Sequence, residues 1–285
     1  MHIRRISSRD RSAVDELLTT APRLSVQVPW HKLPDLLFQE PTFVVEQAGE
    51  IGCIFGVTIE PERVARLHVF ALRAGWSTTE TLAVLLPDVL NALQRLQIEI
   101  VAHLGTENWL IEALVHNGFE RGDTIITMQK TEFSVPTTGN TEITVRPAGA
   151  ADLHTLVEID RVAFSDPLWH HTTAGLSKLY REAAFMIVAG EEMPVGYAYG
   201  EVIGRHGHLS RIAVHPAWQG RQLGVRLLAE SIAHFKARHV FGITLNTQSD
   251  NTRARRLYEW FGFQVLGVEA YVLKRAVLSP LVIDK

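Results

Sequence analysis

The stretch 209–228, LSRIAVHPAWQGRQLGVRLL, constrains this chain more than any other. The apolar run Ile212–Val214 predicts a buried strand, and the His-Pro pair after it predicts the strand's end. A loop with Gly220 and Gly224 follows, and apolar residues at helical spacing then run from Leu223 to Phe235. The first turn of a helix has unpaired N–H groups and a partial positive charge, and glycines let the backbone approach a phosphate. This strand, loop and helix therefore predict an anion site.

The loop lacks two common phosphate-binding patterns and resembles a third. A P-loop needs Lys-Ser or Lys-Thr after its second glycine, and the dinucleotide fingerprint needs three glycines. Residues 219–224, QGRQLG, resemble the acyl-CoA pyrophosphate loop of the GNAT acetyltransferase superfamily. That pattern reads Gln or Arg, two residues, Gly, one residue, then Gly or Ala. Gln222 stands where the family usually has glycine, and Gly220 is an additional glycine that many members carry.

A second segment, 245–263, predicts a strand end followed by a short helix. Asn251 and Tyr258 lie two helical turns apart and so share one face, and Ala254 between them leaves room for a ligand. Gly262 suits the end of such a helix.

This segment also matches the GNAT family, at Asn251, Ala254, Leu257, Tyr258 and Gly262-Phe263. Both matching segments occur in the family's order and at its spacing. The resemblance covers roughly 194–275, and its motif residues are most similar to those of the protein N-terminal and ribosomal-protein acetyltransferase branch.

The sequence contains an internal repeat, in which the second half resembles the first. Arg4 and Asp10 in the first half correspond to Arg146 and Asp152 in the second half. Near the ends of the halves, Asn117–Phe119 corresponds to Phe261–Phe263 at a similar distance along the chain. The polar stretch 131–141 between the halves, TEFSVPTTGNT, is typical of a linker. This layout resembles tandem GNAT proteins, of which mycothiol synthase is one kind. We expect a degenerate GNAT-like domain at 1–130, a linker at 131–141 and a catalytic GNAT domain at 142–285.

Each half should be an α/β (α+β) domain with a mixed, mostly antiparallel sheet flanked by helices. In the first half the pattern predicts strands at 42–47, 51–59, 65–72, 98–102 and 125–130 and helices at 78–96 and 108–116. In the second half it predicts strands at 184–189, 195–203, 208–214, 241–246 and 269–274 and helices at 152–163, 173–183, 223–237 and 251–261.

The resemblance implies a site for acetyl-CoA as co-substrate. The backbone of the strand before the loop would pair with the pantetheine, and the loop amides would bind the pyrophosphate. Asn251 would contact the pantetheine arm, beside Ala254. The cofactor residues so implied are Ile212, Ala213, Val214, Gln219, Gly220, Arg221, Gln222, Leu223, Gly224, Val225, Asn251 and Ala254.

The implied reaction moves the acetyl group to a primary amine by direct attack. Tyr258 would protonate the departing thiolate, because a phenol with a pKa near 10 can donate to a thiolate whose conjugate acid has a pKa near 8.5. Glu201 and His208, on strands beside the cleft, are the candidate bases that deprotonate the amine, without a motif to support them. Asp166 and Trp169 are candidate substrate contacts, since this region walls the acceptor pocket in the family.

The first half lacks these features. Tyr258 aligns with Leu114, and the corresponding loop around Gly75 has a single glycine followed by Glu80. We therefore expect the first half to keep the fold without acetyl transfer. A transferase for longer acyl-CoA and a non-catalytic acyl-CoA sensor remain alternatives.

Composition narrows the partners and the compartment. A net charge of −3 gives no basic field for nucleic acid or for a membrane surface, and the single cysteine, Cys53, excludes an intrachain disulfide. The N-terminus lacks the apolar core of a secretory signal, no apolar run is long enough for a membrane span, and the histidines lack a metal-ligand spacing. We expect a cytoplasmic protein without a metal that accepts a small-molecule or peptide amine, as a monomer with pseudo-dimeric halves or as a homodimer.

Overall fold

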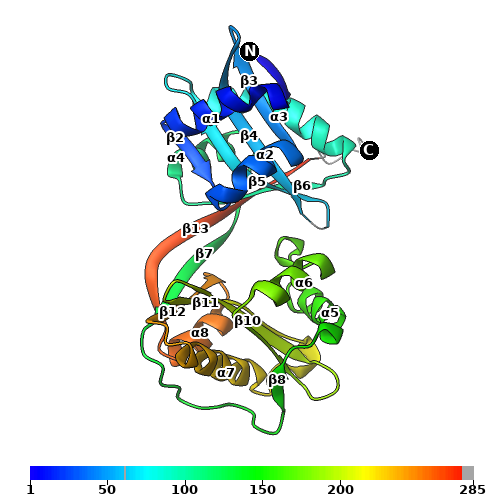
Figure 1. Ribbon diagram of the computed structural model, residues 1–285, viewed down its shortest axis with the longest axis vertical. Helices are drawn as coiled ribbons and strands as arrows, with labels where there is room; N and C mark the ends of the chain where they lie inside the picture. The colour runs from blue at the N-terminus through cyan, green and yellow to red at the C-terminus, as the bar shows by residue number, and fades with distance from the viewer. Residues whose placement is uncertain (61, 278–285) are drawn as a thin grey trace, which may run out of the picture. The chain divides into compact units, whose positions relative to one another are not determined.

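The computed structural model of the chain describes residues 1–60 and 62–277 (Figure 1). The chain forms two compact units. Unit 1 contains residues 1–124 and the strand residues from Ala270 onward, and unit 2 contains residues 125–269. Each unit has a mixed, mostly antiparallel sheet with helices on both faces, so the predicted fold class is confirmed. The last eight residues of the predicted second domain, 278–285, lie outside the described part.

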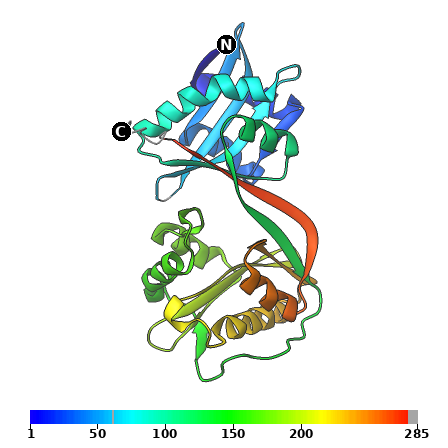
Figure 2. The same cartoon turned by 180° about the vertical axis from the view of Figure 1, so that it is seen from behind.

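Unit 1 begins with a strand and two helices that have a short strand between them, continues with three consecutive strands, and then has a helix, a strand and a helix. Its strands are β1 (His2–Arg5), β2 (Arg23–Val26), β3 (Thr42–Gln47), β4 (Glu50–Glu60), β5 (Val64–Leu72) and β6 (Ile100–Gly105). Its helices are α1 (Arg11–Thr20), α2 (Leu33–Gln39), α3 (Thr78–Arg95) and α4 (Asn108–His116). Helices α3 and α4, which face the viewer in Figure 2, pack on one face of the sheet, and α1 and α2 pack on the other.

Unit 2 repeats this order without a counterpart of β2. Its strands are β8 (Val145–Pro147), β9 (Phe185–Ala189), β10 (Gly196–Ile203), β11 (His206–Val214) and β12 (Gly242–Gln248). Its helices are α5 (Leu153–Ala163), α6 (Thr173–Glu182), α7 (Leu223–Ala237) and α8 (Thr252–Trp260). Apolar residues of α7 and α8 pack on one face of the sheet, and those of α5 and α6 pack on the other face.

A paired arginine and aspartate marks the start of each unit. Arg4 holds Asp10 through two hydrogen bonds of 2.7 and 2.8 Å, and Arg146 holds Asp152 through two of 2.7 and 2.9 Å. In each pair a backbone N–H, of Ser7 or of Gly149, also donates to the carboxylate at 2.7 Å. The same clamp at both ends of the sequence repeat supports a duplicated unit.

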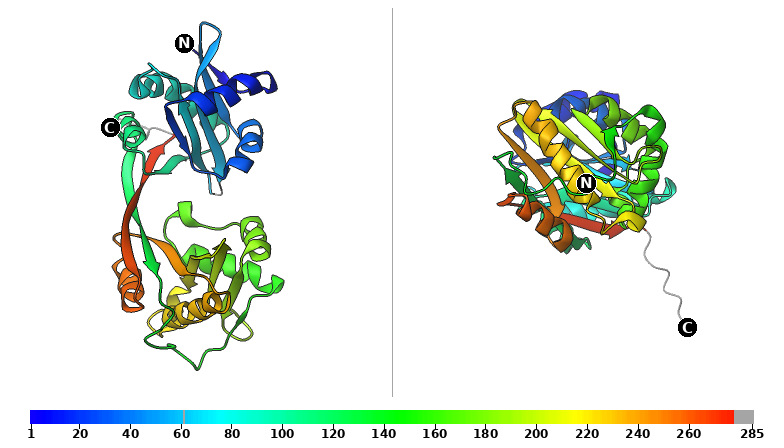
Figure 3. Two further views of the ribbon diagram at one scale, coloured as in Figure 1. Left: turned by 60° about the vertical axis from the view of Figure 1, so that its left-hand side comes forward. Right: turned by 90° about the horizontal axis from the view of Figure 1, so that it is seen from below.

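Two long strands, β7 (Glu120–Lys130) and β13 (Gln264–Ala276), are shared between the units. They lie beside one another in all views, as the left panel of Figure 3 shows. The last part of β7, from Ile125, pairs with β12 in unit 2. The last part of β13, from Tyr271, pairs with β6 in unit 1. Each unit therefore receives a strand from the other half of the repeat.

This exchange differs from the predicted boundaries, which kept each closing strand in its own domain. The residues after Thr124 complete unit 2, and those after Glu269 complete unit 1. Alternation along a strand shows which face it buries but not which sheet it joins, so the exchange could not be predicted from a local pattern. The predicted linker, 131–141, contains no helix or strand, and its residues belong to unit 2.

No helix in the described part of the chain is long and apolar enough to cross a membrane.

Candidate active site

Strand β11 has a free backbone edge in unit 2. It pairs in parallel with β12 only from His206 to Leu209, whereas its other edge pairs with β10 as far as Val214. At Ser210 the register shifts by one residue, which is a β-bulge. Beyond that bulge no described strand pairs with the edge that faces β12. Along Ile212–Val214 this edge therefore has no partner among the described strands and can pair with an extended ligand.

The loop after β11 leads into the N-terminus of α7. Gly220 has a φ of +80°, and Gln222, the residue before the helix, has a φ of +59°. Gln222 makes no side-chain cap, so the first N–H groups of α7 keep their capacity to bind an anion. The Gln219 side chain donates to the Val214 carbonyl at 3.2 Å and joins the loop to the free edge.

Helix α8 forms the facing wall. Asn251 is its N-cap and accepts a hydrogen bond from the Ala254 N–H at 3.1 Å. Tyr258 lies two turns further along the helix. Burial raises the pKa of Tyr258 to about 12, although the charge of Arg211 opposes the shift. The phenol therefore stays protonated at neutral pH, as a proton donor must.

These elements enclose a groove of about 490 Å³. Most of the predicted cofactor residues line it together with Tyr258, namely Ile212, Ala213, Val214, Gln219, Gly220, Gln222, Leu223, Gly224, Val225, Asn251 and Ala254. Arg221 is absent from the lining, because its guanidinium stacks over the Trp218 ring at 4.6 Å. Two segments far apart in sequence thus meet around one cavity.

The groove also contains residues that the sequence did not single out. Trp218 belongs to the loop itself, and Arg253 donates to the Gln219 side chain at 2.6 Å. Phe164 comes from the connection between α5 and α6, where no motif marks it. Arg253 lies five residues before Tyr258, off the helix face that Asn251, Ala254 and Tyr258 share, and no local signal points to Phe164.

The candidate bases lie outside the groove lining. Glu201 on β10 is the cross-strand neighbour of His208 on β11, and both share a sheet face with Tyr199. The His208 ring lies 3.0 Å from the Thr244 hydroxyl. Burial lowers the pKa of His208, although Glu201 opposes the shift, so this imidazole is neutral at pH 7.

The candidate substrate residues lie in the connection between α5 and α6. Asp166 caps a short 3-10 turn by accepting from the Leu168 N–H at 3.0 Å. The Trp169 carbonyl accepts a hydrogen bond of 2.7 Å from Arg211. Neither residue lines the groove. Within the described ranges, no group of three or more His, Cys, Asp or Glu side chains is arranged to hold a metal ion.

Unit 1 has the same bulge but a different edge. In unit 1 the register shifts at His68, as it does at Ser210 in unit 2, and β5 parts from β6 after Arg66. The edge that becomes free in unit 2 is occupied here, because β2 pairs with Val69–Leu72. The loop before α3 is also shorter, 73–77 against 215–222. The edge that corresponds to the free edge of β11 is therefore filled by the chain itself in unit 1.

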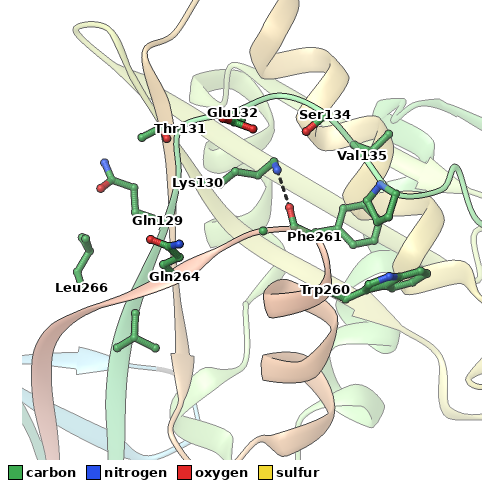
Figure 4. Close-up of a pocket in the computed structure, with 13 residues that line it drawn as sticks. Gln129, Lys130, Thr131, Glu132, Ser134, Val135, Trp260, Phe261, Gln264 and Leu266 are labelled. Atoms are coloured by element: carbon green, nitrogen blue, oxygen red, sulfur yellow. Dashed lines mark hydrogen bonds between the residues drawn. The ribbon is translucent and has the colours of Figure 1, made fainter.

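A separate hollow of about 700 Å³ lies at the end of α8 (Figure 4). Lys130, from the exchanged strand β7, reaches the Phe261 carbonyl at 2.5 Å there. Burial lowers the pKa of Lys130, and Glu132 opposes the shift. The lysine caps the helix that carries Tyr258, so β7 supports the groove from the far end of α8.

Comparisons with known proteins concern unit 2 in sequence and the whole chain in fold. The acetyltransferase (GNAT) family matches residues 153–263, which lie within unit 2. The chain is 38% identical over 87 residues to N-alpha-acetyltransferase 40 of Saccharomyces cerevisiae, a match that covers 28% of this chain and only 30% of that protein.

Two solved structures resemble the whole chain in fold. A GCN5-related N-acetyltransferase from Sphaerobacter thermophilus has a TM-score of 0.66 at 18% identity, covering 98% of this chain and 96% of that one. A tandem GNAT protein from the clavulanic acid biosynthesis pathway has a TM-score of 0.65 at 12% identity, covering 98% and 99%. Residues 153–263 thus match the acetyltransferase (GNAT) family, and the whole chain resembles a tandem GNAT protein in fold.

Proposed function

We propose that unit 2 is an N-acetyltransferase that moves an acetyl group from acetyl-CoA to a primary amine. The observation that supports this proposal is the groove, in which a free strand edge, an uncapped helix N-terminus and the half-buried Tyr258 phenol meet. The free edge of β11 suits the amides of pantetheine, and the loop before α7 suits a pyrophosphate.

The reaction proceeds by direct attack. The neutral amine attacks the thioester carbonyl carbon, the C–S bond breaks, and the thiolate leaves as CoA. Tyr258 donates its phenolic proton to that sulfur, because its raised pKa keeps it protonated until the thiolate forms. The proton lost by the amine goes to Glu201 or His208, directly or through water. His208 is suited to this because its imidazole is neutral before the reaction.

The likeness to a yeast N-alpha-acetyltransferase supports one choice of acceptor. We assign a peptide α-amine as the first acceptor to test, ahead of lysine and small-molecule amines. Unit 1 takes no part in transfer, since β2 fills its strand edge and Leu114 stands where unit 2 has Tyr258.

The test is release of CoA thiol from acetyl-CoA with a panel of peptides that carry free or blocked α-amines, lysine, and small amines. The proposal expects thiol release with free amines and none with blocked ones. Acetyl-CoA binding without thiol release for any amine would instead support the non-catalytic sensor. Faster release from a longer acyl-CoA would identify the other transferase.

A further inference from the structure

The two units differ most at the segment between their first two helices. In unit 1 this segment, 21–32, contains β2, which pairs with the edge of β5. The pairing continues past β2, since the Gln27 N–H donates to the His68 carbonyl at 2.8 Å. In unit 2 the equivalent segment, 164–172, forms no strand and leaves the edge of β11 free. A feature of unit 2 therefore keeps the segment 164–172 from pairing with the edge of β11, which corresponds to the paired edge of β5.

The two edges differ in sequence at the bulge itself. Val69 follows the bulge in β5 and faces Gly56, and Arg211 follows it in β11 and faces Tyr199. Val69 is buried, and its backbone pairs with Val26 of β2. Unit 1 thus has a small apolar side chain where unit 2 has a long cationic one.

Arg211 inserts its guanidinium between β11 and the 164–172 segment. Its Nη2 group donates to the Trp169 carbonyl at 2.7 Å and lies 3.0 Å from Nε2 of His171. The guanidinium also lies over the Phe164 ring, 4.3 Å from its centroid. Three residues of the segment are therefore held by the side chain rather than by the backbone of the strand.

Asp160, at the end of α5, fixes this arrangement. Its carboxylate is fully buried and lies 3.4 Å from Nε of Arg211. It accepts hydrogen bonds from the Tyr197 hydroxyl at 2.6 Å and from the His171 N–H at 2.8 Å. Burial, aided by the charge of Arg211, lowers the pKa of His171 to about 4, so its ring stays neutral and can accept from Arg211. The guanidinium therefore contacts Asp160, His171 and the Trp169 carbonyl at the same time.

We propose that Arg211 is a positioning residue that holds the 164–172 segment off the edge of β11 and so keeps the acyl-CoA groove open. The inference builds on the function proposed above, in which Ile212–Val214 receives the pantetheine. Unit 1 shows the alternative, in which an apolar residue at this position lets the segment pair with the strand. Phe164, which lines the groove, is placed there by the same contact.

The test is Arg211→Val, which gives unit 2 the residue of unit 1. Hydrogen–deuterium exchange of peptides covering 210–214 is measured without ligand, and the acetyl-CoA Kd is measured by titration. The inference expects slower exchange in the variant, because the segment now pairs with the edge, and a Kd at least ten-fold weaker. Equal or faster exchange, or an unchanged Kd in the folded variant, overturns it.

Two controls separate this role from general destabilisation. Arg205→Val also removes one positive charge, from the turn before β11, where Arg205 contacts the Phe241 ring. It should change neither the exchange at 210–214 nor the acetyl-CoA Kd. Tyr197→Phe removes one hydrogen bond from Asp160 and should lower stability without slowing exchange at 210–214.

If Arg211→Val fails to fold, the double variant Arg211→Val with Asp160→Asn removes the buried charge together with its partner. Hydrogen–deuterium exchange at 210–214 and the acetyl-CoA Kd of this double variant then test the inference in the same way. A wild-type protein that binds no acetyl-CoA would refute the proposed function, whereas the exchange measurement without ligand would still test the role of Arg211.

Discussion

Leu114 and Tyr258 occupy the same place in the two units. The Leu114 carbonyl accepts a hydrogen bond from the Phe119 N–H at 3.0 Å. The Tyr258 carbonyl accepts one from the Phe263 N–H at 2.9 Å. In both units the glycine between helix and phenylalanine has a positive φ. The helix end is thus preserved while the side chain that can donate a proton occurs in one unit alone.

Tyr258→Phe should lower kcat by about 10²- to 10⁴-fold, the usual contribution of a positioned acid or base. The ring remains to pack beside Phe263, so the groove should keep its shape and the acetyl-CoA Kd should change little. Steady-state kinetics and titration of the same preparation check this. Leu114→Met, at the equivalent place in unit 1, should leave kcat unchanged. A kcat of wild-type size in Tyr258→Phe would mean that another group protonates the thiolate.

A fragment that begins at Thr131 should fail to fold stably. It lacks the part of β7 that pairs with Ile243–Gln248 of β12, and it lacks Lys130, which caps α8. A fragment that begins at Ile125 keeps both and should show a cooperative unfolding transition. Thermal unfolding followed by circular dichroism compares the stability of the two fragments. Equal melting behaviour would show that the exchanged strand is not needed for unit 2.

Asp10 should make stability depend on acid pH. The hydrogen bonds from Arg4 hold the pKa of Asp10 at about 2, below its ordinary 3.8. The folded state therefore binds fewer protons, and this stabilisation is present above pH 4 and disappears as the pH falls through 2. Asp10→Asn should cost about 2 kcal/mol at pH 7.

Urea unfolding of the wild type and Asp10→Asn at pH 7 and pH 3 measures the loss in the free energy of unfolding. This loss should be smaller at pH 3. Arg146 lowers the pKa of Asp152 in the same direction, so Asp152→Asn serves as a parallel case in unit 2. A loss of equal size at both pH values would contradict the linkage.

Gln222→Gly should stabilise the protein by up to about 1 kcal/mol, because a residue with a side chain pays about that much for a left-handed conformation. Gln222 has a φ of +59° at the start of α7. Thermal unfolding of the variant measures the gain. The comparison variant is Gln219→Gly, at a φ of −67°, which should destabilise because it loses the bonds to Val214 and Arg253. A lower melting temperature for Gln222→Gly would show that its side chain makes a contact worth more than the strain.

Local patterns predicted the elements well. The helices α4 and α7 begin and end where the periodicity placed them, at Asn108–His116 and Leu223–Ala237. The helix with Tyr258 is one residue shorter at each end than predicted, because Asn251 is its cap. Apolar spacing and capping residues act over a few positions, so a single sequence contains that information.

Pairings between distant segments were not predictable in the same way. β2 is a short segment whose partner, the edge at Val69–Leu72, lies in another part of unit 1. The strand exchange and the place of Phe164 likewise depend on contacts that no local motif encodes. Tyr258 was accessible to sequence reasoning because a family motif surrounds it. Arg211 was not, because its meaning appears only when its partners in the 164–172 segment are known.

We propose that unit 2 binds acetyl-CoA, whereas unit 1 fills its own strand edge with β2. Isothermal titration of the full chain with acetyl-CoA tests it most directly. We predict one site per chain, lost on a substitution that blocks the groove of unit 2, such as Ala254→Trp. Two sites per chain would contradict it, because β2 would then have to leave the edge of β5.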